Sequence, residues 1–190
     1  MNEIFVTSDL HFNHDKDFIW QPRGYANIKE MNEDIVRKWN LRVDKTDTVY
    51  VLGDIMLGND IDEGMRLFNS LNGEKIIILG NHDSTSRIEA YQESGYETDW
   101  AKLIKYKGYN FYLSHYPTLT ANADDFKRGL KGRVINLCGH SHTKNALADM
   151  DKGIIYHVEM DAHHCLPVQL DKIIDEIVLE VAARKAQIYT

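Results

Sequence analysis

The sequence of 190 residues has the length of one domain, and its 43% hydrophobic and 27% charged residues are typical of a soluble globular fold, which excludes a mainly disordered chain. Its 22 lysines and arginines against 29 aspartates and glutamates give a net charge of −7, which argues against binding of duplex nucleic acid through a basic surface. The longest apolar runs cover only a few residues, too few for a membrane span.

The first residues and the cysteines indicate a compartment. The segment MNEIFVTSD has no basic stretch ahead of an apolar one, so no signal peptide is predicted. Two cysteines, Cys138 and Cys165, are too few for a disulfide framework and fit a reducing environment. We therefore expect a cytoplasmic protein without a membrane partner, in which residues 1–190 form one domain. Cys138 ends an apolar run, which predicts a buried side chain and not a ligand.

Strands alternate with helices along the first half of the chain. Short runs of β-branched and aromatic residues predict strands at Glu3–Ser8, Thr48–Leu52 and Lys75–Leu79. Helical spacing and capping signals predict helices over about residues 27–41, between Asp60 and Gly73, and at Ser84–Ser94.

The second half favours antiparallel strands followed by one helix. Gly108 separates two strand-like segments and predicts a hairpin. His157 lies inside a predicted strand, so we expect a structural role for it. The lysines of the strand predicted at Lys102–Lys107 are expected on its solvent face. This half therefore completes an α/β sandwich with a mixed sheet. Its expected elements are strands at Lys102–Lys107, Tyr109–Ser114, Arg133–Cys138 and Gly153–Met160, and a helix from Asp171 to about Ala183.

Polar side chains follow five of the predicted strands. Ligands of open α/β sheets bind beyond the carboxyl ends of the strands, so we expect these side chains to share one site. Gly53, Gly80 and Gly139 precede three of the clusters and permit a sharp turn or a close backbone approach. The clusters, in chain order, are Asp9 with His11, Asp54, Asn81 with His82 and Asp83, His115, and His140 with His142.

The ligand atoms in these clusters are oxygen and imidazole nitrogen, without thiolate. Such a set suits Mn, Fe, Ni, Zn or Mg better than a sulfur-bound structural zinc. The seven candidate ligands are too many for one tetrahedral ion and suit two ions about 4 Å apart that share a carboxylate. They are Asp9, His11, Asp54, Asn81, His115, His140 and His142.

The order of these motifs resembles that in the calcineurin-like metallophosphoesterases. The sequence around the motifs is most similar to that of the small, cap-less members in bacteria and phages. The resemblance covers nearly the whole chain. It implies an α/β fold, a four-layer α-β-β-α sandwich with two mixed β-sheets flanked by helices, which is the metallo-dependent phosphatase-like architecture. The motifs are Asp9-x-His11, Gly53-Asp54, Gly80-Asn81-His82-Asp83, His115 and Gly139-His140-x-His142.

The resemblance also implies roles for individual residues. His82 would face the scissile phosphate and protonate the leaving oxygen or stabilise charge on phosphorus, and Asp83 would orient His82 through a hydrogen bond. One ion would be held by Asp9, His11, Asp54 and His142, and the other by Asp54, Asn81, His115 and His140, with Asp54 bridging.

The implied activity is hydrolysis of phosphate esters by a metal-bridging hydroxide, with two divalent cations as cofactors. Manganese is the expected ion, with Fe, Ni, Zn or Mg as alternatives. A phosphodiesterase acting on nucleotide-type or small diesters is expected, because the short segments between motifs leave no room for a large specificity cap. The alternatives are a phosphomonoesterase acting on a nucleotide, sugar phosphate or phosphoprotein, a nucleic-acid end-processing enzyme, and a non-catalytic binding module.

Several residues outside the ligand set are expected near the site. His14 follows His11 by three residues, and Arg23 has a planar fork suited to phosphate, so both are candidate substrate contacts together with Asn81. Trp20 and Tyr25 could stack on a base, although isolated aromatic residues more often belong to the core. His163 and His164 are expected in a polar loop, with a place at the mouth of the site as the alternative.

Overall fold

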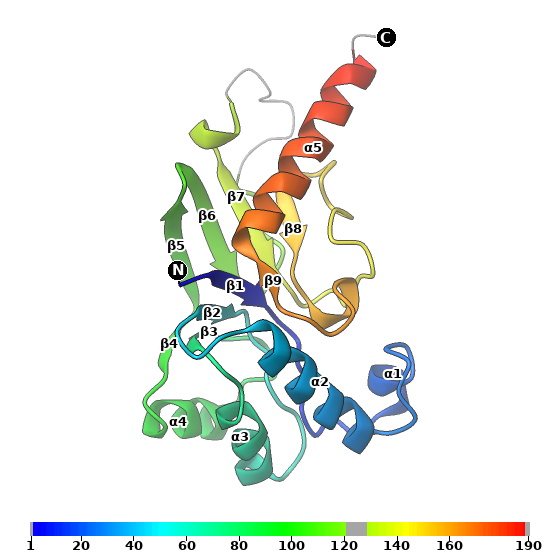
Figure 1. Ribbon diagram of the computed structural model, residues 1–190, viewed down its shortest axis with the longest axis vertical. Coiled ribbons are helices and arrows are strands. Elements are labelled where there is room, and N and C mark those ends of the chain that lie inside the picture. Colours follow the sequence, from blue (N-terminus) through cyan, green and yellow to red (C-terminus); the bar gives the residue numbers. More distant parts are fainter. Residues whose placement is uncertain (1, 121–128, 189–190) are drawn as a thin grey trace.

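Two mixed β-sheets form the centre of the computed structural model, which describes residues 2–120 and 129–188 (Figure 1). In the first sheet, β1 to β4 run parallel and β9 pairs antiparallel with β1. In the second, β5 is antiparallel to β6, while β6, β7 and β8 are parallel. The order is β4-β3-β2-β1-β9 and β5-β6-β7-β8. The strands are β1 (Ile4–Thr7), β2 (Thr48–Val51), β3 (Glu74–Ile78), β4 (Glu97–Asp99), β5 (Ala101–Tyr106), β6 (Tyr109–Ser114), β7 (Val134–Cys138), β8 (Ile155–His157) and β9 (Val168–Gln169).

Helices flank both sheets, which confirms the expected α/β architecture. Helices α2 and α3 lie on one side of the first sheet, and α5 lies on the other side and contacts β1 and β9 (Figure 1). Only half of the capping box predicted at Asp60 is present: the Asp60 carboxylate accepts the Glu63 backbone N–H at 2.9 Å, but the Glu63 carboxylate accepts from Arg66. The helices are α1 (Asp17–Trp20), α2 (Ile28–Arg42), α3 (Ile61–Asn69), α4 (Thr85–Glu93) and α5 (Leu170–Ile188), with 3-10 turns η1 (Leu130–Gly132) and η2 (Met160–Ala162).

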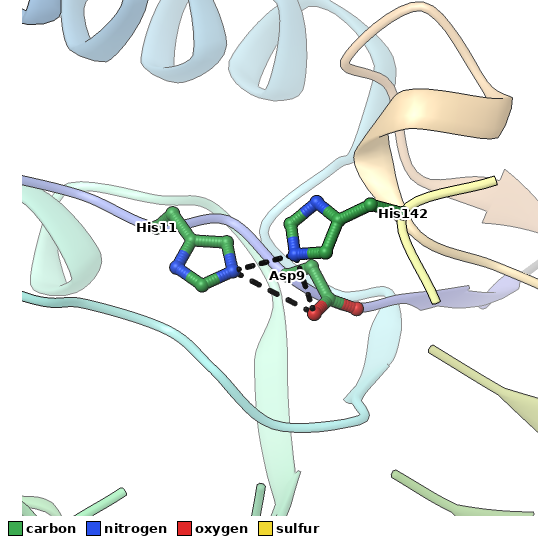
Figure 2. Close-up of side chains that lie close together, drawn as sticks. All are labelled: Asp9, His11 and His142. Carbon is green, nitrogen blue, oxygen red and sulfur yellow. Dashed lines mark hydrogen bonds and ion pairs between the residues drawn. The ribbon is translucent and has the colours of Figure 1, made fainter. Parts of the chain in front are cut away.

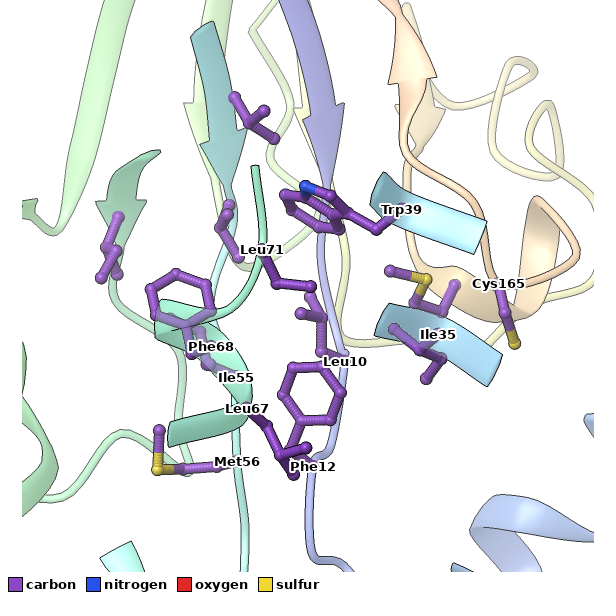
Figure 3. Packing of buried hydrophobic residues seen from close by; sticks show 14 of the residues in the cluster. Leu10, Phe12, Ile35, Trp39, Ile55, Met56, Leu67, Phe68, Leu71 and Cys165 are labelled. Atoms are coloured by element: carbon purple, nitrogen blue, oxygen red, sulfur yellow. The ribbon is translucent and has the colours of Figure 1, made fainter. Parts of the chain in front are cut away.

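Successive side chains of β1, β2 and β3 point to opposite faces of the first sheet, and each face packs into a core of its own. Phe5 belongs to the cluster beneath the helices, where Trp39 of α2 and Phe68 of α3 pack (Figure 3). Val6, the next residue, belongs to the cluster that joins the two sheets and α5. The carboxyl ends of the strands are therefore held rigidly between two cores.

The strand predicted at Gly153–Met160 is shorter than expected. It pairs with β7 only at Ile155–His157, and the chain then leaves the second sheet. Glu159 forms an isolated bridge with Ser8 at the end of β1, and the Met160 N–H donates to the Ser8 carbonyl at 3.1 Å. The segment after β8 therefore ties the second sheet to the carboxyl end of the first.

Three further expectations were wrong in detail. Helix α3 ends at Asn69 and not near Gly73, which turns the chain into β3 with φ +91°. Leu103 is exposed on the same face of the edge strand β5 as Lys105, whereas Lys102 is only partly exposed and points to the opposite face, so the lysines do not share one solvent face. The last helix extends beyond Ala183 to Ile188.

Among the described residues, no helix is both long and apolar enough to span a bilayer.

Candidate metal centre

The loops that follow the strands meet at one edge, as the sequence predicts. The Asp9 N–H donates to the Gly53 carbonyl at 3.0 Å and the His11 N–H to the Asp54 carbonyl at 3.1 Å, so the loops after β1 and β2 run side by side. In the second sheet the Gly139 N–H donates to the His115 carbonyl at 2.9 Å. Short loops on adjacent parallel strands thus bring the polar clusters together.

The first group of possible metal ligands is Asp9, His11 and His142, whose side chains point toward one another (Figure 2). The Nε2 atoms of His11 and His142 are 3.1 Å apart and lie 3.7 and 3.6 Å from Asp9 Oδ1. Ligand atoms about 2.1 Å from one ion, at angles between octahedral and tetrahedral, are about 3.0 to 3.5 Å apart. The 3.1 Å separation lies within this range and the other two exceed it by 0.2 Å or less, so a small movement of Asp9 would let the three atoms share a cation.

The second group is Asp9, Asp54 and His115, and Asn81 and His140 lie beside it. Asp54 Oδ2 is 3.6 Å from His115 Nε2. Asn81 Oδ1 lies 2.9 Å from His115 Nε2 and 2.9 Å from His140 Nδ1. The structure thus brings all seven expected ligands together, with Asp9 common to both groups.

Asp54, a member of the second group, also approaches the first. Its Oδ2 atom is 3.9 Å from His11 Nε2 in the first group, besides its approach to His115 in the second. Its Oδ1 atom accepts the His82 backbone N–H at 2.9 Å. One oxygen therefore positions the loop that carries His82, while the other faces the expected ligands.

The protonation pattern of His115 indicates that a cation fits here. Its Nδ1 can only donate to the Leu52 carbonyl, at 2.8 Å, so in the neutral ring Nε2 carries a lone pair. That lone pair faces the amide oxygen of Asn81, and two acceptors at 2.9 Å repel each other unless a positive charge lies between them. Asp9 Oδ1 is likewise buried without a hydrogen-bond donor among the described residues. The residues therefore fit divalent cations.

The backbone at the site is strained. Non-glycine residues rarely adopt the left-handed region, and such conformations cluster at functional sites at a cost of about 1–3 kcal/mol each. Five of the seven expected ligands adopt it, with φ between 50° and 71°. They are Asp9, His11, Asp54, His140 and His142.

Two predicted glycines are required by close contact. A Cβ atom on Gly139 would lie 2.2 Å from Asp9 Oδ2, and one on Gly80 would lie 2.3 Å from Asp54 Oδ1. The absent side chains let the carboxylates approach the neighbouring loops. This confirms the expected close approach before the ligands.

The electrostatics of Asp9, His11 and His140 favour cation binding. Burial raises the pKa of Asp9, but the adjacent His11 ring, with the charges of His115 and His142, outweighs it and lowers that pKa to about 2. Burial lowers the pKa of His11 and of His140, which favours the neutral rings that bind metals. The carboxylate is thus ionised and these imidazoles are neutral near pH 7.

Asp161, in η2, is a functional residue that the sequence did not indicate. Its Oδ2 accepts His142 Nδ1–H at 2.9 Å, which directs Nε2 of that ring toward Asp9. Burial lowers the pKa of His142, but the hydrogen bond that its Nδ1–H donates to Asp161 has the opposite effect, and the pKa is raised overall. A carboxylate behind a histidine ligand fixes its tautomer and orientation. Asp161 was missed because no local pattern marks it.

Arg23 is not a substrate contact, contrary to the expectation. Its side chain is 1% exposed, and its guanidinium donates from Nε and Nη2 to the two Asp161 oxygens at 3.1 and 2.7 Å. Further bonds go to the carbonyls of Leu10 and Asp9. The planar fork is therefore already engaged in a buried ion pair that positions Asp161.

His82 lies at the open rim, with its side chain 43% exposed and its Nε2 3.9 Å from Asp54 Oδ2. The predicted hydrogen bond from Asp83 to His82 is wrong. The Asp83 carboxylate accepts the backbone N–H of Gly80 at 2.7 Å and of Asp54 at 3.1 Å, and the Tyr91 hydroxyl at 2.8 Å. Asp83 thus shapes the loop that carries His82 and does not contact its ring.

The remaining predicted residues are placed as follows. His14 Nδ1 is 3.3 Å from His11 Nδ1, and burial with the charges of His11 and His82 lowers the His14 pKa to about 4. His157 is buried between Asp149 and Glu159, which confirms a structural role. His163 Nε2 donates to the His157 carbonyl. Trp20 and Tyr25 pack partly buried against the first core, and Cys138 is fully buried.

The fold and the polar cluster together define a metal-binding hydrolase that acts on phosphate esters. The chain belongs to the calcineurin-like phosphoesterase family, whose model matches residues 3–176. It is 32% identical over 182 residues to an uncharacterized protein of Methanocaldococcus jannaschii, covering 92% of this chain and 90% of that protein. It is 30% identical over 194 residues to the gene 66 protein of Mycobacterium phage D29, covering 91% and 94%. A solved protein of unknown function from Aquifex aeolicus matches with a TM-score of 0.71 and 25% identity, over 93% of this chain and all of that one.

Proposed function

We propose that this protein is a dinuclear phosphodiesterase with manganese as the expected metal. Asp9, His11, Asp54 and His142 would hold one ion, and Asp54, Asn81, His115 and His140 would hold the other. The observation that carries the proposal is the lone pair of His115 Nε2 facing Asn81 Oδ1 at 2.9 Å, next to the unpaired buried oxygen of Asp9. When bound, two divalent cations lower the pKa of an attacking water and offset the charge of the phosphoryl oxygens.

The protein side chains supply the remaining steps. His82 donates a proton to the leaving oxygen, which fits its exposed position beside the ligands. Its backbone is held by the Asp54 carboxylate at 2.9 Å and by Arg87, which donates to the His82 carbonyl at 2.9 Å. His14 is a candidate donor to a phosphoryl oxygen, because its lowered pKa keeps the ring neutral with one N–H.

A diester is favoured by the openness of the centre. Asn81, His82 and His140 are exposed at its outer rim, while Asp9, His11 and His115 are buried beneath them. A rim of this kind accommodates a phosphate with a substituent on each side.

The proposal is tested by hydrolysis of bis-p-nitrophenyl phosphate and p-nitrophenyl phosphate by metal-stripped protein, with Mn²⁺, Ni²⁺, Mg²⁺ or no metal added. We expect turnover of the diester that depends on metal. Asp54→Asn should lose both turnover and bound manganese, because Asp54 Oδ2 faces ligands of both groups. Asp34→Asn, a carboxylate paired with Lys38 on α2, is the matched control and should behave as wild type.

Turnover of the monoester alone would refute the diester preference and favour a phosphomonoesterase. Full manganese content in Asp54→Asn would refute the bridging role. Absence of hydrolysis with every metal, together with absence of bound metal, would favour a binding module.

A further inference from the structure

Two large aromatic side chains at the metal centre are exposed. Phe18 on α1 has 69% of its surface exposed, and Tyr116, two residues after β6, has 49%. Exposed rings beside a polar site are informative, because they offer apolar surface where a ligand arrives. The aromatic residues expected from the sequence to stack on a base, Trp20 and Tyr25, instead pack against the first core.

The Tyr116 ring lies next to two of the proposed ligands, and the Phe18 ring lies next to His14, which in turn contacts a ligand of the first group. The Phe18 ring is perpendicular to His14, with centroids 5.6 Å apart, and His14 in turn lies 5.2 Å from His11 of the first group. The Tyr116 ring lies 4.7 Å from His140 and 5.1 Å from His115, both beside the second group. A phosphate held between the two groups would therefore have one exposed ring near each of its substituents.

Both rings are held by ordered backbone. The Tyr116 carbonyl accepts the hydroxyls of Ser114 at 2.8 Å and Thr118 at 3.0 Å. Phe18 is followed by Ile19, which is buried in the first core and anchors α1. Anchored platforms lose little conformational entropy when a flat ligand stacks on them.

We infer that Phe18 and Tyr116 are stacking platforms for the bases on the two sides of the scissile phosphate, so that the substrate is a dinucleotide or a short single strand. This inference rests on the proposed phosphodiesterase function. Nucleobases are flat rings attached to phosphodiesters, and any of the bases can stack on an aromatic side chain, so stacking does not require a particular nucleotide sequence. The net charge of −7 favours a short strand, because a long one gains affinity from many basic contacts.

The test compares two diesters with the same leaving group on manganese-loaded protein: the p-nitrophenyl ester of thymidine 5′-phosphate and methyl p-nitrophenyl phosphate. The ratio of their kcat/KM values isolates the contribution of the base. We expect wild type to prefer the thymidine ester by between about 5-fold and about 100-fold, the usual range for one stacked base. Phe18→Ala or Tyr116→Ala, whichever removes the platform for this base, should abolish most of that preference, and Tyr116→Phe should retain it.

Binding supplies a second readout that does not need turnover. The affinity of manganese-loaded protein for the phosphorothioate of thymidylyl-thymidine should fall at least about 5-fold in both alanine variants, since this ligand carries a base on each side. Leu179→Ala on α5 is the matched control, because Leu179 is as exposed as Phe18, at 69%, and lies outside the cluster.

Equal kcat/KM for the two esters, together with unchanged affinity in both alanine variants, would overturn the inference while leaving the phosphodiesterase proposal intact. If wild type hydrolyses neither ester but binds the phosphorothioate with an affinity that falls in both alanine variants, the proposed activity is overturned and the stacking role of Phe18 and Tyr116 is retained. An equal loss of affinity in Leu179→Ala would also count against the inference, because it would reveal a general surface effect.

Discussion

Replacing Asp161 by asparagine is the sharpest test of how the first group of ligands is held. Asp161 Oδ2 accepts from His142 Nδ1 at 2.9 Å and from Arg23 Nη2 at 2.7 Å, and Oδ1 accepts from Arg23 Nε at 3.1 Å. Asparagine keeps the shape of this side chain but replaces one acceptor oxygen by a donor NH₂ group. In either orientation of the amide, at least one N–H of Arg23 then faces a donor.

The structure sets the size of the expected effect. Loss of the partner behind a histidine ligand costs about 10- to 100-fold in metal affinity, and we expect the lower end, about 1.4 kcal/mol, because the amide oxygen can still accept from His142. The unmatched N–H of buried Arg23 costs a further 1–3 kcal/mol, roughly, in folding. A change of 1 kcal/mol lowers the Tm of a chain of this size by about 2–4 °C.

The assay is calorimetric titration of metal-stripped protein with Mn²⁺, with thermal unfolding measured on the same samples. The matched control is Asp149→Asn. Asp149 also accepts from a buried histidine, His157, at 3.0 Å, but that ring is not a ligand. Asp149→Asn should therefore leave the manganese affinity within about twofold of wild type. If Asp161→Asn folds normally and binds manganese as tightly as the control, the argument that Asp161 positions His142 is refuted.

Two further predictions concern His82 and Lys75. His82→Ala should retain its metals and lose about 10²- to 10⁴-fold in kcat, most for esters with poor leaving groups, whereas an equal loss across leaving groups would contradict a proton-donor role. Burial lowers the pKa of Lys75 from 10.5 to about 8, so the unfolded chain binds more protons between these values and stability rises with pH in that window. From about pH 7.5 to about pH 9.5, the free energy of unfolding of wild type, measured in urea titrations, should rise by about 2 kcal/mol relative to that of Lys75→Met. If the free energies of the two proteins change in parallel with pH, the Lys75 amine is not desolvated.

The convergence of the candidate metal ligands was largely predictable, because these residues follow strands with clear local patterns. Parallel strands end at the same edge of a sheet, so polar residues after the runs that became β1, β2 and β3 had to converge. The hairpin at Gly108 was equally local, since Lys107 and Gly108 both adopt positive φ in a two-residue turn. The short strands β4 and β9 were missed, because two or three residues carry no periodic signal.

The surroundings of the ligands depend on contacts that local patterns cannot indicate. Arg23 and Asp161 are 138 positions apart, and they meet only because the segment after β8 crosses from the second sheet to the end of β1. That crossing turned an expected substrate contact into a buried ion pair. It also placed a carboxylate behind His142.

The sequence alone determined most of the strand and helix segments, the polar residues that follow the strands and the oxygen–nitrogen character of the expected ligand set, because these follow from spacing and side-chain chemistry. Only the tertiary structure decided which acceptor backs each imidazole, that Asp83 bonds to backbone N–H groups and not to His82, and that Phe18 and Tyr116 remain exposed beside the centre. Hydrogen-bond partners and exposure are set by how the two sheets pack, and that packing brings together residues whose separation along the chain has no regular period.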